Sequence, residues 1–431
     1  MANHRRLGIC RSGLAGVALV LAARAAGAQS SMPEAPPPVE PWYEAVQLRA
    51  FADGYVGANW AFPKPTRYQP PTRSFDGPQG FALSWIGLDA TFAPEPVGGT
   101  LNLRFGPTAT LHAGEDAGSG LEYVKQAFVA WRPGSGSLTL ELGKFDTFVG
   151  VEAAESQDNF NYTRGLLFSF AQPLFHTGVR ATADLVDGLT LTAMVANGLN
   201  RSFDNNVGKT FGLGLSVNPS DAFAASLSWL GGPEQPDSTE VACSSGTAYD
   251  PEVGSCAAKA GAPAQTQVVD RGGANDFNAW RHLVDFSLRL QPMESLAVVL
   301  NADYGVEGVR PADTSIEAEP KAEKWYGAAL LTRMQLSETW AVALRGEYLA
   351  DPDGRALAFT RPDGAALTDT ALGSATLTIE ARPTDNLILR LDSRGDFVLD
   401  AAPDKEIFRE KVRGSSDKLF TTTLGVVVTT N

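Results

Sequence analysis

Charged side chains recur at every second position in several short segments of this chain. The clearest run is Arg390, Asp392, Arg394 and Asp396. Side chains two residues apart lie on the same face of a β-strand, so these four charges would form one row. The same spacing predicts further charges on the same face of neighbouring strands: Arg180, Asp184, Arg345, Glu347, Glu380 and Arg382.

Rows of alternating Arg and carboxylate side chains have two plausible roles. Beside an aqueous lumen, they create a transverse electric field that orients water and ions. Alternatively, they neutralise one another and simply fill the wall, which is the simpler role. A lipid-facing orientation is disfavoured, because an Arg or Lys at mid-bilayer costs roughly 2–4 kcal/mol. We therefore expect these residues to line a water-filled pore.

A second charged segment spans residues 144–176. It is too irregular for one strand and too rich in Gly, Asn and aromatic residues for one helix. Folded inward, such an insertion would narrow the lumen; folded outward, it would cap the mouth. We favour the inward arrangement, in which the charges of the insertion form a constriction that tunes conductance: Lys144, Asp146, Glu152, Glu155, Asp158 and Arg164.

The insertion also resembles a known family. The run GKFDTFVGVEAAES…NFNYTRGLLFSFAQPLFHTGVRA, followed by Asn197–Gly198 and by DNN at Asp204–Asn206, is similar to the OmpL-like outer-membrane β-barrel porins. The close similarity covers residues 138–230, and the rest of the chain shows only general barrel patterning. The resemblance implies a pore in the bacterial outer membrane and no particular solute.

Motifs for catalysis and metal binding are not evident. The four His residues lie in separate segments: His4, His112, His176 and His282. We find no Ser beside a base with an orienting partner, no zinc spacing, no calcium loop and no phosphate-binding Gly loop. We therefore expect neither an enzyme nor a bound cofactor or metal.

Two Cys residues, Cys243 and Cys256, lie in one polar loop, whereas Cys10 lies near the N-terminus. In an oxidising compartment this pair is expected to form a disulfide. It would contribute about 2–3 kcal/mol, mainly locally, because it closes a short loop. A metal site is the alternative, but two Cys supply only half of a tetrahedral shell.

These residues need strands to position them, and the sequence has the required pattern. From residue 46 onward, apolar and polar residues alternate, as in Val46, Gln47, Leu48 and Arg49. Such alternation is typical of a strand with one face toward lipid and one toward water. We identify about sixteen such segments, among them 46–61, 100–111 and 418–430. Each is near the roughly 9–11 residues that a tilted strand needs to cross a bilayer.

The connections between these segments alternate in length. Short ones such as 187–188 and 219–222 are separated by long ones such as 144–176 and 231–280. Short periplasmic turns alternating with long extracellular loops are typical of bacterial barrels. The predicted fold is an all-β transmembrane antiparallel barrel of about sixteen strands over residues 46–431. A soluble all-β protein such as a propeller is the alternative, but we find no fixed-period repeat.

Aromatic and apolar residues fit a membrane-embedded barrel. Several Trp residues fall near predicted strand ends, where an interfacial girdle would lie: Trp60, Trp131, Trp229, Trp280, Trp325 and Trp340. The last segment, KLFTTTLGVVVTTN, has apolar residues on one face and resembles the closing strand that barrel-insertion machinery recognises. It ends in Asn431 rather than in an aromatic residue.

The N-terminal region has the features of a secretory signal. Basic residues precede the apolar run 13–23, and Ala26-Gly27-Ala28 matches a cleavage site, so we predict a signal peptide over 1–28. Residues 29–45 then form a Pro-rich periplasmic leader. Four of the 35 basic residues and none of the 49 acidic residues lie in 1–28, which gives the mature chain a net charge of −18.

Charge and composition narrow the function. A strongly acidic chain argues against nucleic acid as a partner. The charged content of 19% is below the roughly 25% of soluble domains. We expect a porin for passive diffusion, whose partners are outer-membrane lipids, small hydrophilic solutes or ions, and the insertion machinery, either alone or as a homo-oligomer. A plugged barrel serving as receptor, adhesin or scaffold is the alternative; a barrel enzyme would need a Ser or His cluster that we do not find.

Overall fold

The computed structural model describes residues 42–430, apart from 65–67, 78, 135, 251–254, 271–276, 310–318, 361–365, 401, 403–404 and 413. The predicted signal peptide and the leader as far as residue 41 lie outside this range. The last four residues of the predicted leader form a 3-10 helix, η1 (Trp42–Ala45). None of the helices in the described part of the chain is long and apolar enough to cross a membrane.

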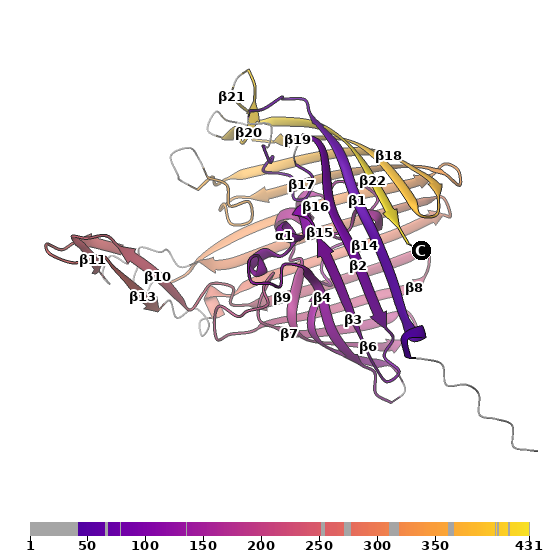
Figure 1. Ribbon diagram of the computed structural model, residues 1–431, viewed down its shortest axis with the longest axis horizontal. Coiled ribbons are helices and arrows are strands. Elements are labelled where there is room, and N and C mark those ends of the chain that lie inside the picture. Colours follow the sequence, from indigo (N-terminus) through magenta and orange to yellow (C-terminus); the bar gives the residue numbers. More distant parts are fainter. Residues whose placement is uncertain are drawn as a thin grey trace, which may run out of the picture. The chain divides into compact units, whose positions relative to one another are not determined.

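Sixteen strands close into one antiparallel barrel (Figure 1). Each strand pairs with the next in the series, and the last pairs with the first through register partners such as Ala52 and Val428. The predicted sixteen-stranded barrel is therefore confirmed. The strands are β1 (Val46–Asn59), β2 (Gly80–Phe92), β3 (Val97–Phe105), β4 (Val124–Trp131), β5 (Leu138–Asp146), β6 (Phe175–Val186), β7 (Leu189–Ala196), β8 (Thr210–Ser220), β9 (Phe223–Gly232), β14 (Arg281–Met293), β15 (Leu296–Val309), β16 (Lys321–Gln335), β17 (Trp340–Asp351), β18 (Thr370–Thr384), β19 (Leu387–Val398) and β22 (Lys418–Thr429).

One predicted strand, 100–111, is wrong at its end. β3 stops at Phe105, and a short helix, α1 (Pro107–His112), follows it. Gly106 adopts a φ of 127°, a conformation that other residues rarely adopt. Pro107 then occupies the first helical turn, where its fixed φ suits a helix and its missing N–H is not needed.

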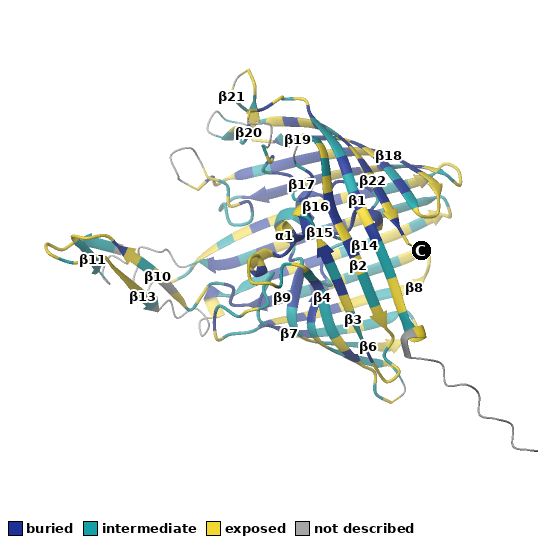
Figure 2. Cartoon of the chain, in the orientation of Figure 1, coloured by how far each residue is buried: buried dark blue, intermediate teal, exposed yellow. Residues whose placement is uncertain are grey.

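The two faces of the barrel wall differ in exposure, because buried and exposed residues alternate along the strands (Figure 2). On β16, Tyr326, Leu330 and Met334 are exposed on the outer face, whereas Ala329 is buried on the inner face. Most apolar side chains of the strands thus point outward, as a lipid-facing surface requires. The prediction for Trp325 is wrong, because it shares the inward parity of Ala329 and is buried.

The long loops contain small sheets that the sequence did not predict. After β9, β10 (Ser238–Cys243) pairs with β13 (Gln265–Asp270), and β11 (Thr247–Asp250) pairs with β12 (Ser255–Ala258). After β19, β20 (Phe408–Glu410) pairs with β21 (Gly414–Ser416). A disulfide between Cys243 and Cys256 joins β10 to β12. These sheets lie at the opposite end of the barrel from the short turns (Figure 1).

Candidate functional site

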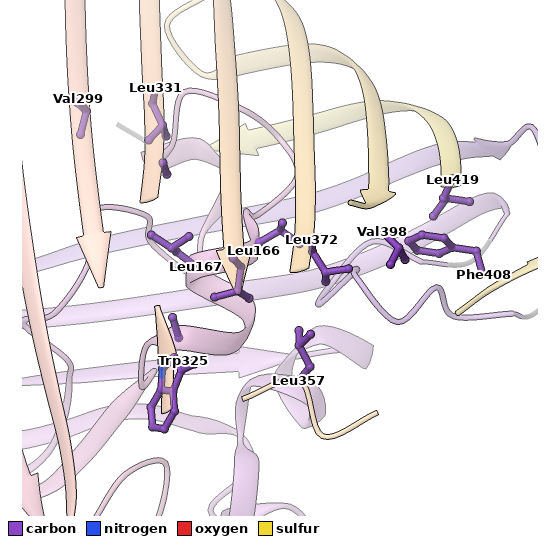
Figure 3. Close-up of a cluster of buried hydrophobic side chains, with 13 residues drawn as sticks. Leu166, Leu167, Val299, Trp325, Leu331, Leu357, Leu372, Val398, Phe408 and Leu419 are labelled. Carbon is purple, nitrogen blue, oxygen red and sulfur yellow. The ribbon is translucent and has the colours of Figure 1, made fainter. Parts of the chain in front are cut away.

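The segment between β5 and β6 lies inside the barrel. It contains η3 (Ser156–Asp158) and η4 (Leu167–Ala171). Phe168 belongs to one buried cluster with Phe51 of β1 and Trp85 of β2. The neighbouring residues Leu166 and Leu167 belong to another, with side chains of β15, β16 and β17 (Figure 3). A segment that packs against both parts of the wall must occupy the lumen.

Glu155 fastens this insertion to the early strands. Its Oε1 lies 2.7 Å from Arg104 Nη2, and its Oε2 lies 3.0 Å from Lys125 Nζ. Asp146 at the end of β5 is 2.5 Å from the same Lys125 nitrogen. Burial alone would raise the pKa of Glu155, but Lys125 and Arg104 lower it well below its ordinary value. Glu155 is therefore a buried anion held between two cations.

Lys144 and Arg164 are also occupied by structural contacts. Lys144 Nζ lies 2.6 Å from Asp116 Oδ2 in the loop after α1. The Arg164 guanidinium donates to backbone carbonyls within the insertion, including that of Tyr162 at 2.6 Å and that of Ala154. Both cations are almost completely buried. Arg164 thus holds the insertion in its fold, whereas Lys144 lies on β5 rather than in the insertion and ties this strand to the loop after α1.

A second fastening point lies on β17. Arg345 Nη1 is 2.6 Å from Glu152 Oε1, and Arg345 Nε is 3.0 Å from Glu347 Oε2. The other oxygen of Glu347 accepts a hydrogen bond from the backbone N–H of Leu166 at 2.7 Å. Two carboxylates thus share one guanidinium, and one of them also binds the insertion backbone.

The inner face of β18 and β19 carries a connected row of charges. Glu380 lies 2.7 Å from Arg390, 2.6 Å from Arg333 on β16 and 3.0 Å from Arg382. The Arg390 guanidinium also donates to the backbone carbonyl of Ser156 in the insertion. This part of the predicted row is therefore a mutually compensated network that contacts the insertion.

The other half of the row contacts the insertion as well. Arg394 lies 2.7 Å from Asp396 and donates to the backbone carbonyl of Arg164 at 2.5 Å. Asp392 accepts a hydrogen bond from the backbone N–H of Thr163 at 2.9 Å. Charge-assisted hydrogen bonds of this kind are roughly twice as strong as neutral ones.

Three predicted residues lie outside this network. Arg180 pairs with Glu141 on β5, at 2.5 Å. Asp184 is exposed near the short-turn end of β6 and accepts a hydrogen bond from Thr190. Asp158 forms a half-exposed ion pair with Arg49, at 3.6 Å.

Free space remains on both sides of the insertion. An outer cavity of about 400 Å³ is lined by Ala171, Gln172, Leu283 and residues of the long loops. An inner cavity of about 400 Å³ is lined by Glu152, Asp158, Ser287, Arg289 and Val299. Toward the short turns, an end cavity of about 820 Å³ is lined by Arg49, Asp158 and Arg382, among others.

Sequence reasoning missed two partners of the predicted charges, Lys125 and Asp116. Lys125 has the parity of the exposed Val129 and Trp131 on β4. It is nevertheless buried, beside a register irregularity between Asn102 and Leu103 of β3, so simple alternation does not reveal it. Asp116 lies in a 3-10 turn, η2 (Gly114–Asp116), where no periodicity marks it. Asp53 accepts hydrogen bonds from Tyr162 and Ser156 of the insertion, each at 2.7 Å.

In the part of the chain that the structure describes, no group of three or more His, Cys, Asp or Glu is placed to hold a metal ion. His176 is buried, with its ring nitrogens 3.2 Å from the Gly198 carbonyl and 3.1 Å from the Thr147 hydroxyl. Its contacts are those of a packed and hydrogen-bonded side chain.

Sixteen strands close into an antiparallel barrel that is apolar outside, charged inside and filled by a long inserted segment. These features define the class of outer-membrane channel barrels. The family described as "Putative beta-barrel porin-2, OmpL-like" matches residues 45–429. The chain therefore belongs to this family, which confirms the resemblance of its 138–230 region and places it in the bacterial outer membrane.

Solved structures share this fold at low sequence identity. The outer membrane channel DcaP of Acinetobacter baumannii has a TM-score of 0.53 at 11% identity, covering 89% of this chain and 97% of that one. An anion-selective porin from Comamonas acidovorans has a TM-score of 0.51 at 12% identity, covering 89% and 99%. OprB of Pseudomonas putida has a TM-score of 0.52 at 10% identity, covering 90% and 94%. No curated protein matches the sequence.

Proposed function

We propose that this protein is a porin through which small hydrophilic solutes or ions diffuse passively across the outer membrane. The observation that best supports this proposal is a charged inner wall with cavities on both sides of a segment fixed inside the barrel. Family membership and fold support the same function, since both are those of pores rather than of catalysts.

The proposed path runs between the insertion and the wall formed by β8, β9, β14, β15 and β16. The inner cavity is lined by side chains of these strands together with Glu152 and Asp158. We infer that Asp158, whose side chain is half-exposed, is the member of the predicted constriction that meets a passing solute. Glu152, Glu155 and Arg164 act on the solute indirectly, by fixing the insertion, whereas Lys144 fixes the loop after α1 to β5.

A plugged barrel remains the second candidate, and one observation favours it. The insertion is bonded to β1, β3, β4, β17 and β19 at once, which fixes it as firmly as a plug. In that case the protein would serve as a receptor, adhesin or scaffold without conductance. The outer and inner cavities would then be dead ends.

Swelling of proteoliposomes in isotonic sugar solutions separates the two candidates. The porin proposal expects swelling that is fast for a pentose and slower for a disaccharide, because the lumen is narrowed. Vesicles with folded, heat-modifiable protein that swell no faster than empty vesicles would support the plug. The variant Asp158→Asn should keep the swelling rate for sugars but change the relative rates for charged solutes.

Two partners follow from the outer surface. The exposed apolar residues of the strands contact outer-membrane lipids. We infer that β22, whose Phe420, Leu424, Val426 and Val428 are all exposed on one face, also engages the barrel-insertion machinery. Replacing Phe420 with Asp should reduce the amount of assembled barrel in cells without blocking refolding in detergent.

A further inference from the structure

Two carboxylates on the lumen wall lack the basic partners that most of their neighbours have. Asp285 on β14 and Asp303 on β15 are register partners, and they are 1% and 4% exposed. In the described part of the chain, neither forms an ion pair with Lys or Arg, whereas Glu155, Glu380 and Asp396 each do. The two carboxyl groups therefore have no compensating cation among the described residues.

Each of the two carboxylates also leaves one oxygen without a donor. Oδ1 of Asp285 and Oδ1 of Asp303 are buried and receive no hydrogen bond. The two carboxyl groups lie within hydrogen-bond reach of one another. A buried charge without a partner is costly, so two of them side by side require a counter-charge or a shared proton.

The pair lies between the two cavities of the proposed path. On the inner face of β14, Leu283 lines the outer cavity and Ser287 lines the inner cavity, with Asp285 between them. On β15, Val299 lines the inner cavity, two residues before Asn301 and four before Asp303. A solute that moves from one cavity to the other along this wall therefore passes the pair.

A side chain of the insertion closes this passage. Gln172 Nε2 donates to Asn301 Oδ1 at 2.7 Å and to Asp303 Oδ2 at 2.8 Å. Asn301 in turn donates to Asp285. Gly150 packs so closely on Gln172 that a Cβ there would lie 2.0 Å from the Gln172 Oε1. A neutral amide is therefore the only insertion side chain that hydrogen-bonds this acidic stretch of wall in the described residues.

We propose that Asp285 and Asp303 form a cation-binding site in the conducting path and that the pore is cation-selective as a result. Gln172 of the insertion partly obstructs the path at this site. This inference deepens the proposed porin function and rests on it. Carboxylate and amide oxygens are the ligands that hard cations such as K⁺ and Ca²⁺ prefer. A weak site of this kind concentrates cations while still releasing them, as conduction requires.

The test is the reversal potential of the full-length mature protein in a planar bilayer with a KCl gradient. The wild-type protein should give a reversal potential whose sign shows that K⁺ is more permeant than Cl⁻. Asp285→Asn/Asp303→Asn should lose most of this potential while still conducting. The control Asp187→Asn/Asp221→Asn removes the same two charges from exposed short turns and should behave as wild type.

Two further measurements keep the inference open to refutation if the double variant does not fold. Added Ca²⁺ should reduce the K⁺ current of wild type, because a divalent ion stays longer at two carboxylates. Gln172→Ala should raise the conductance and keep the cation preference. An unchanged reversal potential in the double variant, or a wild-type K⁺ current that Ca²⁺ does not reduce, would overturn the proposed cation-binding site. Asp285 and Asp303 would then instead share a proton. The porin function itself would survive that result, whereas a wild type without conductance would contradict both.

Discussion

Glu155 offers the sharpest test of how the insertion is held in the lumen. The variant Glu155→Gln keeps the size of the side chain but removes the anion between Arg104 and Lys125. Removing one partner of a buried ion pair usually costs about 3–5 kcal/mol, because a buried charge is left uncompensated. Here Arg104 still has Asp89 at 2.6 Å, and Lys125 still has Asp146 at 2.5 Å. We therefore expect the lower end, about 3 kcal/mol.

A loss of about 3 kcal/mol would raise the undocked population of the insertion about a hundredfold. Arg164 is 2% exposed, so trypsin can cleave after it only when the insertion leaves the lumen. Cleavage at Arg164 in refolded protein should accelerate strongly in Glu155→Gln, and single-channel current should become larger and noisier. Both effects share one cause, the release of the insertion from the wall.

Asp158 provides the control for this experiment. It lies in the same insertion, three residues away, but its ion pair with Arg49 is half-exposed and 3.6 Å long. Exposed pairs contribute only about 0–1 kcal/mol, so Asp158→Asn should leave cleavage at Arg164 slow. Equal cleavage rates in wild type and Glu155→Gln would refute the idea that buried ion pairs dock the insertion.

Three further outcomes are expected. Burial and the nearby Lys125 lower the pKa of His112 from 6.5 to about 3. Below pH 6.5 the unfolded chain therefore binds a proton that the folded chain excludes. The free energy of unfolding should fall by about 2 kcal/mol between about pH 7.5 and about pH 5. Thermal unfolding in detergent should show this loss in wild type and much less of it in His112→Phe. Cys243→Ser/Cys256→Ser should leave conductance and barrel melting unchanged, because the disulfide lies in the β10–β13 region; lower conductance would contradict this. Leu330→Arg on the lipid face should cost roughly 2–4 kcal/mol in refolding free energy, and Met334→Arg, near the strand end, about 0–1 kcal/mol; equal costs would contradict the assigned outer face.

The barrel strands could be predicted because both faces of the wall constrain the sequence. Lipid requires apolar residues at alternate positions, and the lumen tolerates polar ones, so period two dominates the wall. Register irregularities, such as that between Asp53 and Gly54 of β1, interrupt it locally. The pattern fails where the chain leaves the wall. The segment 100–111 reads as alternating across Gly106 and Pro107, although these two residues end β3 and begin α1.

The partners of the site residues could be predicted only partly. Arg390 and Asp392 share one strand, so their common face follows from parity alone. The contact between Glu155 and Lys125 depends on how an irregular insertion folds back, and no local period encodes that path. Trp325 shows the same limit: its position near a strand end suggested an interface, but a neighbour within the lumen, the Leu166–Leu167 cluster, accounts for its burial.

The most direct test of the central claim is the single-channel conductance of the refolded mature chain in a planar bilayer. A porin whose lumen is narrowed by a fixed insertion should give steady, ohmic current steps. A folded, heat-modifiable barrel that never conducts would contradict this account and leave the insertion as a plug.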